Sequence, residues 1–197
     1  MARLAPTDPF VSIRAVAAHQ VAQAVMDGTD FGVAATVPVA HSMAWQPLTD
    51  VPLRAYVATD HPWAVQGRRS VELAELVREK LVLLTGEHPA RTVIDQAVAE
   101  AELAFGEVEE SSSGPMIQGL AAAGFGIGVV TDLPRFSAYP LLITTTGGNT
   151  LRLFLHACWS AQHYAAPAIE SFVERLREFA VGQVHTAAWR GNADRER

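Results

Sequence analysis

Apolar and polar residues follow a strand, helix, strand order at the start of the chain. Residues Val11–Val16 alternate between apolar and polar, as expected for a strand with one buried face. His19–Gly28 follows with apolar residues at helical spacing and a glycine that stops the helix. Phe31–Thr36 is a mostly apolar run, typical of a strand covered on both faces. We therefore expect the chain to open with a strand, a helix and a second strand.

A second series of strands and helices is predicted in the middle of the chain. Because strands and helices alternate there, a parallel α/β sheet is expected. The predicted strands are Leu53–Ala58, Leu81–Leu84, Glu107–Glu110 and Ile127–Val130, and the predicted helices are Val71–Glu79, Ala90–Ala101 and Pro115–Ala123.

The last part of the chain predicts one more strand and a long amphipathic helix. Leu151–Ala157 alternates as a strand does, and Ala165–Ala180 follows helical spacing. From Gln183 onwards the periodicity is lost, and we expect residues 185–197 to form a solvated tail. The apolar stripe of the helix consists of Ile169, Phe172, Val173, Leu176 and Phe179.

Composition and charge exclude several classes of function. The 197 residues are 49% apolar, enough for a sizeable core in one domain or two small lobes. The chain has 15 basic and 21 acidic residues and a formal net charge of −6, so this segment is not expected to bind DNA directly. The single cysteine, Cys158, lies in an alternating apolar run, where a buried structural thiol is expected. No stretch resembles a signal peptide or a membrane span, and we expect a cytoplasmic protein.

Three predicted helix starts follow predicted strands and contain small or hydroxyl-bearing residues. They are Ala17–His19, Thr85–Pro89 and Ser111–Pro115. Helix N-termini after strand ends present backbone N–H groups and the positive end of the helix dipole. Together with the hydroxyls of Thr85 and the serines, they favour a small anionic ligand such as a carboxylate.

Two of these segments also have an interpretation that needs no ligand. Ser113 or Gly114 caps a helix whose first turn contains Pro115, as in ordinary helices. His19 at a helix start either donates to an effector or caps the helix and faces solvent. The sequence leaves these alternatives open.

No motif for catalysis, metal binding or nucleotide binding is complete. The seven histidines lack the paired spacing of a metal site. Gly124–Gly128 ends a predicted helix and enters a strand, the reverse of a phosphate-binding turn, so a helix C-cap followed by close packing is expected. No nucleophile motif or paired carboxylate is recognisable. We predict a non-enzyme with no catalytic residues, no metal and no cofactor.

Three short pieces, in their order along the chain, resemble a known family. They are the His61-Pro62 turn after an apolar strand, the LeuAlaGluLeu helix at Leu73–Leu76, and the AlaAlaGlyPheGlyIle run at Ala122–Ile127. Asp30–Ala34 and the closing helix at 165–180 fit the same order. Over residues 10–180 the chain resembles the effector-binding domain of LysR-type transcriptional regulators.

The resemblance implies an α/β fold of the type II periplasmic-binding-protein kind, with two Rossmann-like lobes joined by two crossover segments. Lobe one is then expected to comprise residues 1–50 and 160–184, and lobe two residues 51–159. A small effector, anionic or aromatic, is expected between the lobes. The family's ligand-contacting segments point to Ala18, His19, Thr85, Gly86 and Ser160, and the helix starts described above add Ser111, Ser112 and Ser113.

The chain departs from the family pattern at its N-terminus. It has no DNA-binding helix-turn-helix and no first strand of the effector domain, so Met1–Pro9 is expected to begin inside the first helix. The chain is either a fragment or a product without its DNA-binding half, and DNA is expected as a partner only through the absent helix-turn-helix. The family also implies a homodimer or a higher oligomer.

Two rival functions stay open. One is a stand-alone small-molecule binding protein that never binds DNA. The other is an enzyme of the same fold, such as a prephenate dehydratase. The Thr-Arg-Phe motif of those enzymes has its nearest match in Pro134-Arg135-Phe136, which lacks the threonine.

Overall fold

The computed structural model describes residues 12–35 and 42–193, with side chains described up to Val181. The chain forms two compact units, of which unit 1 comprises Met1–Thr49 and Phe154–Arg197 and unit 2 is Asp50–Leu153. The chain therefore passes from unit 1 to unit 2 at residues 49/50 and returns at 153/154. The sequence-based division placed these two passages at 50/51 and 159/160.

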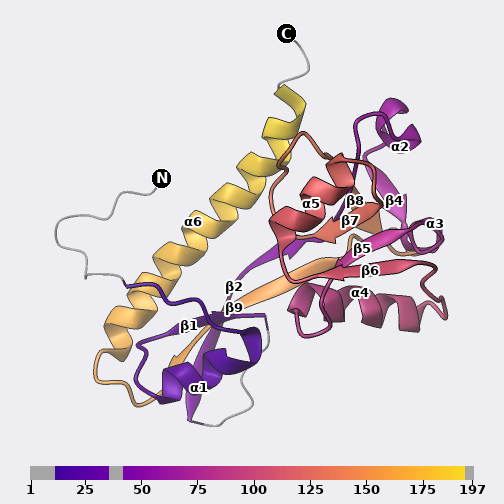
Figure 1. Cartoon of the computed structure of the whole chain (residues 1–197). Helices are drawn as coiled ribbons and strands as arrows, with labels where there is room; N and C mark the ends of the chain where they lie inside the picture. The colour runs from indigo at the N-terminus through magenta and orange to yellow at the C-terminus, as the bar shows by residue number, and fades with distance from the viewer. Residues whose placement is uncertain (1–11, 36–41, 194–197) are drawn as a thin grey trace. The chain divides into compact units, whose positions relative to one another are not determined.

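Unit 1 is built on a sheet of three strands, β1 (Gly32–Ala34), β2 (Met43–Pro52) and β9 (Arg152–Ser160), in the spatial order β1-β9-β2 (Figure 1). β1 is antiparallel to β9, with Gly32 opposite Cys158. Both β2 and β9 cross the boundary between the units. The helices of unit 1 within the described residues are η1 (Ala18–Gln20), α1 (Val21–Met26) and α6 (Ala166–Ala193).

Each face of this sheet packs against a different helix. Cys158 and Trp159 are neighbours in β9, so their side chains point to opposite faces. Cys158 packs in a buried cluster with Val21 of α1, whereas Trp159 packs with Ile169 and Val173 of α6. Full burial of an aliphatic side chain contributes about 1.5–3 kcal/mol. The thiol of Cys158 is free and buried, which confirms the structural role expected from the sequence.

Unit 2 is built on one mixed sheet. In chain order its strands are β3 (Arg54–Val57), β4 (Ser70–Glu72), β5 (Leu81–Leu84), β6 (Val108–Ser111), β7 (Ile127–Val130) and β8 (Tyr139–Thr144). Their spatial order is β4-β8-β3-β7-β5-β6. β5 runs parallel to β6 and β7, and β4 runs parallel to β8, whereas β3 is antiparallel to both of its neighbours.

The helices of unit 2 within the described residues are α2 (Pro62–Val65), α3 (Leu73–Leu76), α4 (Pro89–Glu100) and α5 (Gly114–Ala122). α4 connects β5 to β6 and α5 connects β6 to β7, so right-handed connections place them on opposite faces of the sheet, as Figure 1 shows. α5 packs closely on β7, because a Cβ added to Gly128 would lie 2.7 Å from the Ile117 side chain.

A glycine C-cap ends α5. Gly124 has a φ of 78°, in the left-handed region that glycine adopts without strain. The N–H of Phe125 donates to the carbonyl of Leu120 at 3.0 Å, and the N–H of Gly124 donates to that of Ala121 at 3.1 Å. This pair of hydrogen bonds defines a Schellman motif and confirms the C-cap predicted from the sequence.

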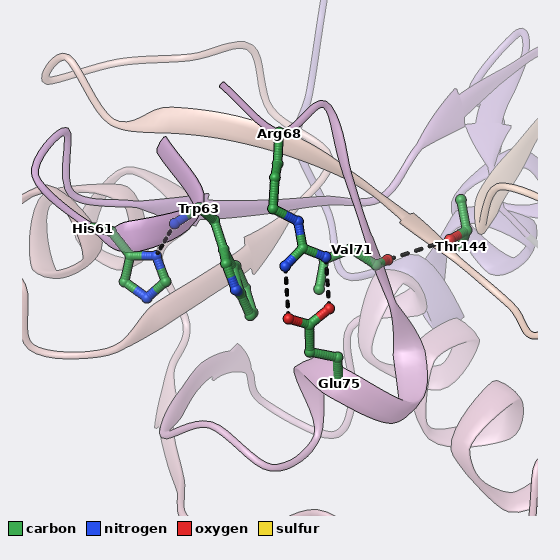
Figure 2. Close-up of polar contacts among 6 residues, drawn as sticks. All are labelled: His61, Trp63, Arg68, Val71, Glu75 and Thr144. Carbon is green, nitrogen blue, oxygen red and sulfur yellow. Dashed lines mark hydrogen bonds and ion pairs between the residues drawn. The ribbon is translucent and has the colours of Figure 1, made fainter. Parts of the chain in front are cut away.

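Side-chain contacts hold the segment from α2 to α3 in place (Figure 2). Arg68 donates two 2.6 Å hydrogen bonds to the carboxylate of Glu75, and its guanidinium carbon lies 5.2 Å from the centre of the Trp63 ring. The guanidinium lowers the pKa of the Glu75 carboxyl. His61 caps α2, because its Nδ1 accepts from the N–H of Trp63 at 3.2 Å. The helix predicted at Val71–Glu79 is wrong in its bounds, because Ser70–Glu72 pair with β8 as β4 and only Leu73–Leu76 are α-helical.

The two ends of unit 2 lie side by side. The backbone N–H of Leu53 donates to the carbonyl of Leu151 at 2.9 Å. Just outside that bond, the guanidinium of Arg152 pairs with the carboxylate of Asp50 at 2.5 Å. Both contacts join the first few residues of the unit to its last few.

The α/β class and most predicted elements are confirmed, but some predictions differ from the structure. Val11–Val16 is wrong as a strand: residues 12–16 belong to no sheet and Ile13 is 90% exposed, because an alternating pattern forms no ladder without a neighbouring strand. The sheet of unit 2 is mixed, since β3 enters it antiparallel. β2, β4 and β8 were not predicted. The expectation for Met1–Pro9 lies outside the described residues.

Helix α6 is longer than the predicted closing helix. The sequence predicts an end at Ala180 and a solvated tail at 185–197, whereas the backbone is helical through Ala193. Extending an existing helix costs little per residue, and Ala187 and Ala188 have the highest helix propensity. Within the predicted apolar stripe, Ile169 and Val173 are buried, but Phe179 is 40% exposed.

Candidate functional site

Five of the predicted ligand residues lie at one edge of the unit 2 sheet. β5 and β6 are parallel neighbours, and Leu84 at the end of β5 lies opposite Ser111 at the end of β6. Thr85 and Gly86 therefore leave the sheet next to Ser112 and Ser113. This is the carboxyl edge of the parallel strands, where α/β sheets commonly bind ligands.

Residues that the sequence analysis missed lie at the same edge. β7 is parallel to β5, so Asp132, two residues beyond the end of β7, belongs to this edge, as does Arg54 at the start of antiparallel β3. The Arg54 guanidinium donates to the carbonyl of Thr131 at 3.3 Å, and the Tyr56 hydroxyl donates to that of Asp132. Burial raises the pKa of Tyr56 to about 12, so its hydroxyl stays protonated. The sequence signal was available, since Asp132 follows a strand that was predicted correctly.

The side chain of His88 caps the N-terminus of α4. The N–H of His88 donates to the carbonyl of Thr85 at 3.0 Å, and Nδ1 of His88 accepts from the N–H of Ala90 at 3.1 Å. Pro89 has no N–H to offer, and the N–H of Arg91 donates to the carbonyl of His88. The backbone donors that the sequence analysis expected here are therefore already bonded, and the Thr85 hydroxyl and the exposed Gly86 remain at the edge.

His88 is a neutral donor at this edge. Its Nδ1 accepts a hydrogen bond, which places the ring proton on Nε2. Burial lowers the pKa of His88, while the charge of nearby Asp132 acts in the opposite direction. The imidazole is therefore uncharged near neutral pH.

The start of α5 is capped by the serines. The hydroxyl oxygen of Ser113 accepts from the N–H of Met116 at 3.4 Å, which confirms Ser113 as the cap. The hydroxyl oxygen of Ser111 accepts from the N–H of Ser113 at 3.2 Å. Ser112 is exposed. The capping interpretation is thus confirmed for Ser113, whereas ligand contact by Ser111, Ser112 and Ser113 stays a prediction.

The remaining predicted residues belong to unit 1. Ala18 and His19 form η1, where Ala18 is half-buried and His19 is exposed. Ser160 ends β9, and its carbonyl accepts from the N–H of His163 at 3.0 Å. Nδ1 of His163 in turn accepts from the N–H of Ala165. Ala18 and His19 lie at a helix start as predicted, but residues 12–17 before them form no strand. The strand that was predicted to end at Ala157 continues to Ser160.

Unit 1 also presents aromatic side chains that the sequence analysis did not select. Trp45 is 47% exposed and Phe154 is 60% exposed. The Trp45 ring meets the ring of His156 edge-on, with centres 5.4 Å apart. Nδ1 of His156 is buried without a hydrogen-bond partner within the described residues.

A shallow cavity of about 260 Å³ lies at the opposite edge of the unit 2 sheet. It is lined by residues next to the amino ends of the parallel strands, among them His61, Lys80 and Phe125. Lys80 already pairs with Glu107 at 2.5 Å. The cavity holds none of the predicted ligand residues.

Within residues 12–35 and 42–193, no three His, Cys, Asp or Glu side chains are grouped so that they could hold a metal ion. Among the same residues, no helix combines the length and the apolar composition that crossing a membrane requires.

Comparisons with known proteins identify the family. Residues 1–181 match the family model of the LysR substrate binding domain, and the chain belongs to this family. An uncharacterised HTH-type transcriptional regulator of Bacillus subtilis, YybE, is 23% identical over 143 residues, which are 73% of this chain and 48% of that protein. The chain thus spans about half the length of this curated relative.

Solved structures confirm the predicted fold class. A cysteine mutant of OxyR from Corynebacterium glutamicum matches with a TM-score of 0.75 at 23% identity, over 89% of this chain and 56% of that one. The effector-binding domain of a BenM variant matches with a TM-score of 0.70 at 17% identity, over 84% and 79%. Both have the two-lobed periplasmic-binding-protein-like fold. Domains of this family are non-enzymatic, bind small-molecule effectors and form oligomers.

Proposed function

We propose that this chain senses a small carboxylate-bearing or aromatic effector and passes the signal to a DNA-binding segment. One observation carries the proposal: the pairing of Leu84 with Ser111, which gathers the ends of β5 and β6 at one sheet edge. Thr85 and Ser112 offer hydroxyl donors there, and His88 offers Nε2–H. Ala18, His19 and Ser160 are the proposed contacts from unit 1.

The effector acts through a difference in affinity between two arrangements of the regulator's subunits. A ligand that binds both arrangements equally does not change the ratio of their populations, however tightly it binds. We propose a homodimer or higher oligomer, located in the cytoplasm, as the responding species. The acidic charge of −6 supports a division of labour in which another segment contacts DNA.

A sensing mechanism based on a disulfide within this segment does not fit the chain. Two of the similar structures are the reduced and oxidised forms of OxyR. This chain has one cysteine, so it cannot form an internal disulfide. Cys158 is moreover 1% exposed, and burial raises the pKa of its thiol, so little reactive thiolate forms. Ligand binding is therefore the better supported signal.

The test is a thermal-shift screen of small aliphatic and aromatic acids, followed by titration of any acid that stabilises the chain. Thr85→Leu should weaken binding about tenfold or more, since it replaces a donor at the sheet edge with an apolar group. Thr92→Leu on the exposed surface of α4 is the matched control and should bind as the wild type does. Equal affinity of the Thr85→Leu and wild-type chains would remove Thr85 from the site.

A stand-alone binding protein is the second candidate, since the acidic charge of this segment is equally compatible with it. The purified chain should give no sequence-selective gel shift with duplex DNA, even at low salt. Both candidates share that expectation. A second assay distinguishes the two candidates, in which the chain is fused to a DNA-binding segment. Only for the regulator should transcription then depend on the effector.

A further inference from the structure

The carboxylate of Asp132 stands directly against the first residue of α5. A Cβ added to Gly114 would lie 2.5 Å from Oδ2 of Asp132, closer than real side chains approach. The φ of Gly114 is not among the positive values, so backbone conformation does not explain the glycine. The carboxylate of Asp132 explains why position 114 is a glycine, because the Cβ of any other residue there would push the carboxylate away.

The first turn of α5 has few backbone donors left for a ligand. Pro115 has no N–H, the N–H of Met116 donates to the Ser113 hydroxyl, and the N–H of Ile117 donates to the Ser113 carbonyl at 3.0 Å. The N–H of Gly114 is the remaining first-turn donor, and Asp132 lies beside it. The negative charge of Asp132 also meets the positive end of the helix dipole.

We propose that Asp132 closes the N-terminus of α5 to anions and thereby selects the chemical group that the effector presents to this turn. An ammonium, amide N–H or hydroxyl group can donate to Asp132, whereas a carboxylate placed there is repelled by it. This inference rests on the proposed function and deepens it. The anionic part of an effector is left to Thr85 and Gly86 at the same sheet edge.

The test uses inorganic sulfate as the anion and the backbone amide signals of the ¹⁵N-labelled chain as the readout, at constant ionic strength. In the wild type, the Gly114 and Met116 signals should show no saturable response. In Asp132→Asn the same two signals should show a saturable response, with sulfate bound about tenfold tighter or more than in the wild type. The reason is that the substitution removes the like charge and keeps the shape of the side chain. Gly114→Ala, which must displace the carboxylate, should also respond to sulfate.

Asp60→Asn is the matched control. It makes the same change in net charge at an exposed carboxylate beyond the other end of β3, and it should behave as the wild type does. Saturable sulfate binding at Gly114 in the wild type, or no response in Asp132→Asn, would overturn the proposal. Because sulfate replaces the effector, this outcome is independent of the Thr85→Leu result, and either proposal can fail without the other.

Discussion

At the scale of single residues, His61 and His88 act as helix caps. His61, His88 and His163 each accept, through Nδ1, the backbone N–H two residues further on. An imidazole can do this only while that nitrogen carries no proton. His88 is the N-cap of α4, so its protonation would place a positive charge at the positive end of that helix's dipole.

His88 should therefore make the fold sensitive to mild acid. Its pKa is lower in the folded chain than the ordinary value of about 6.5, so the unfolded chain binds the proton first. The stability that this cap contributes is present above that ordinary value and is lost as the pH falls towards the folded pKa. Urea unfolding at neutral pH and in mild acid should show a smaller loss for His88→Asn, which caps without titrating, than for wild type. His19→Asn, at an exposed histidine, is the control, and an equal loss in all three chains would contradict this role.

Cys158 should react only when unit 1 opens. The thiol packs with Val21 and Val25 between the sheet and α1, and burial disfavours its thiolate. Alkylation by iodoacetamide should be slow in the native chain and should speed up by orders of magnitude in denaturant, as followed by mass spectrometry. Val25→Ala, which loosens the contact, should raise the native rate. Fast labelling of the native wild type would show that α1 does not protect the thiol.

At the scale of elements, the sequence predicted strand ends best where a strand is fully buried and turn residues such as glycine mark its limits. Leu81–Leu84 and Ile127–Val130 have the predicted ends, because each is a fully buried apolar run and glycines precede the second. β2 was missed because Pro47 and polar residues interrupt its pattern, and β8 because Pro140 stands near its start. These strands take their place from neighbours distant in sequence.

The site was also predicted only where it follows from neighbouring residues in the sequence. Thr85 and the serines follow predicted strands directly, so their edge could be inferred from the order of elements. Asp132 could not be assigned to the start of α5, because that contact depends on β7 returning beside β5. The capping of α4 by His88 was also missed, since it depends on the ring orientation of one side chain.

The contacts of Arg68 should stabilise the segment from α2 to α3. Arg68→Ala removes a two-pronged ion pair that is partly exposed and a contact with Trp63, for an expected loss of about 1–2 kcal/mol. Arg69→Ala, at the exposed neighbouring arginine, should be near neutral. Chemical denaturation measures both. Because Arg68 lowers the pKa of Glu75, its contribution is present above the ordinary glutamate pKa and falls as the pH drops through the folded value.

At the scale of the whole molecule, we expect self-association. The family forms oligomers, and large apolar side chains are exposed on unit 2 at Met116, Leu133 and Phe136. Light scattering after gel filtration should show a dimer or a larger species at micromolar concentration. A stable monomer over the whole concentration range would contradict this expectation.

Because contacts join Leu53 to Leu151 and Asp50 to Arg152, we expect unit 2 to fold as a separable module. A domain whose two ends touch can be excised, closed into a ring or inserted into a loop of another protein without stretching its host. Residues 50–153 produced alone should give the dispersed amide spectrum of a folded protein, and ligation of their ends should raise the melting temperature. Unit 2 inserted into a loop of a fluorescent protein would then serve as a sensor. The fluorescence of the host would report on what unit 2 binds.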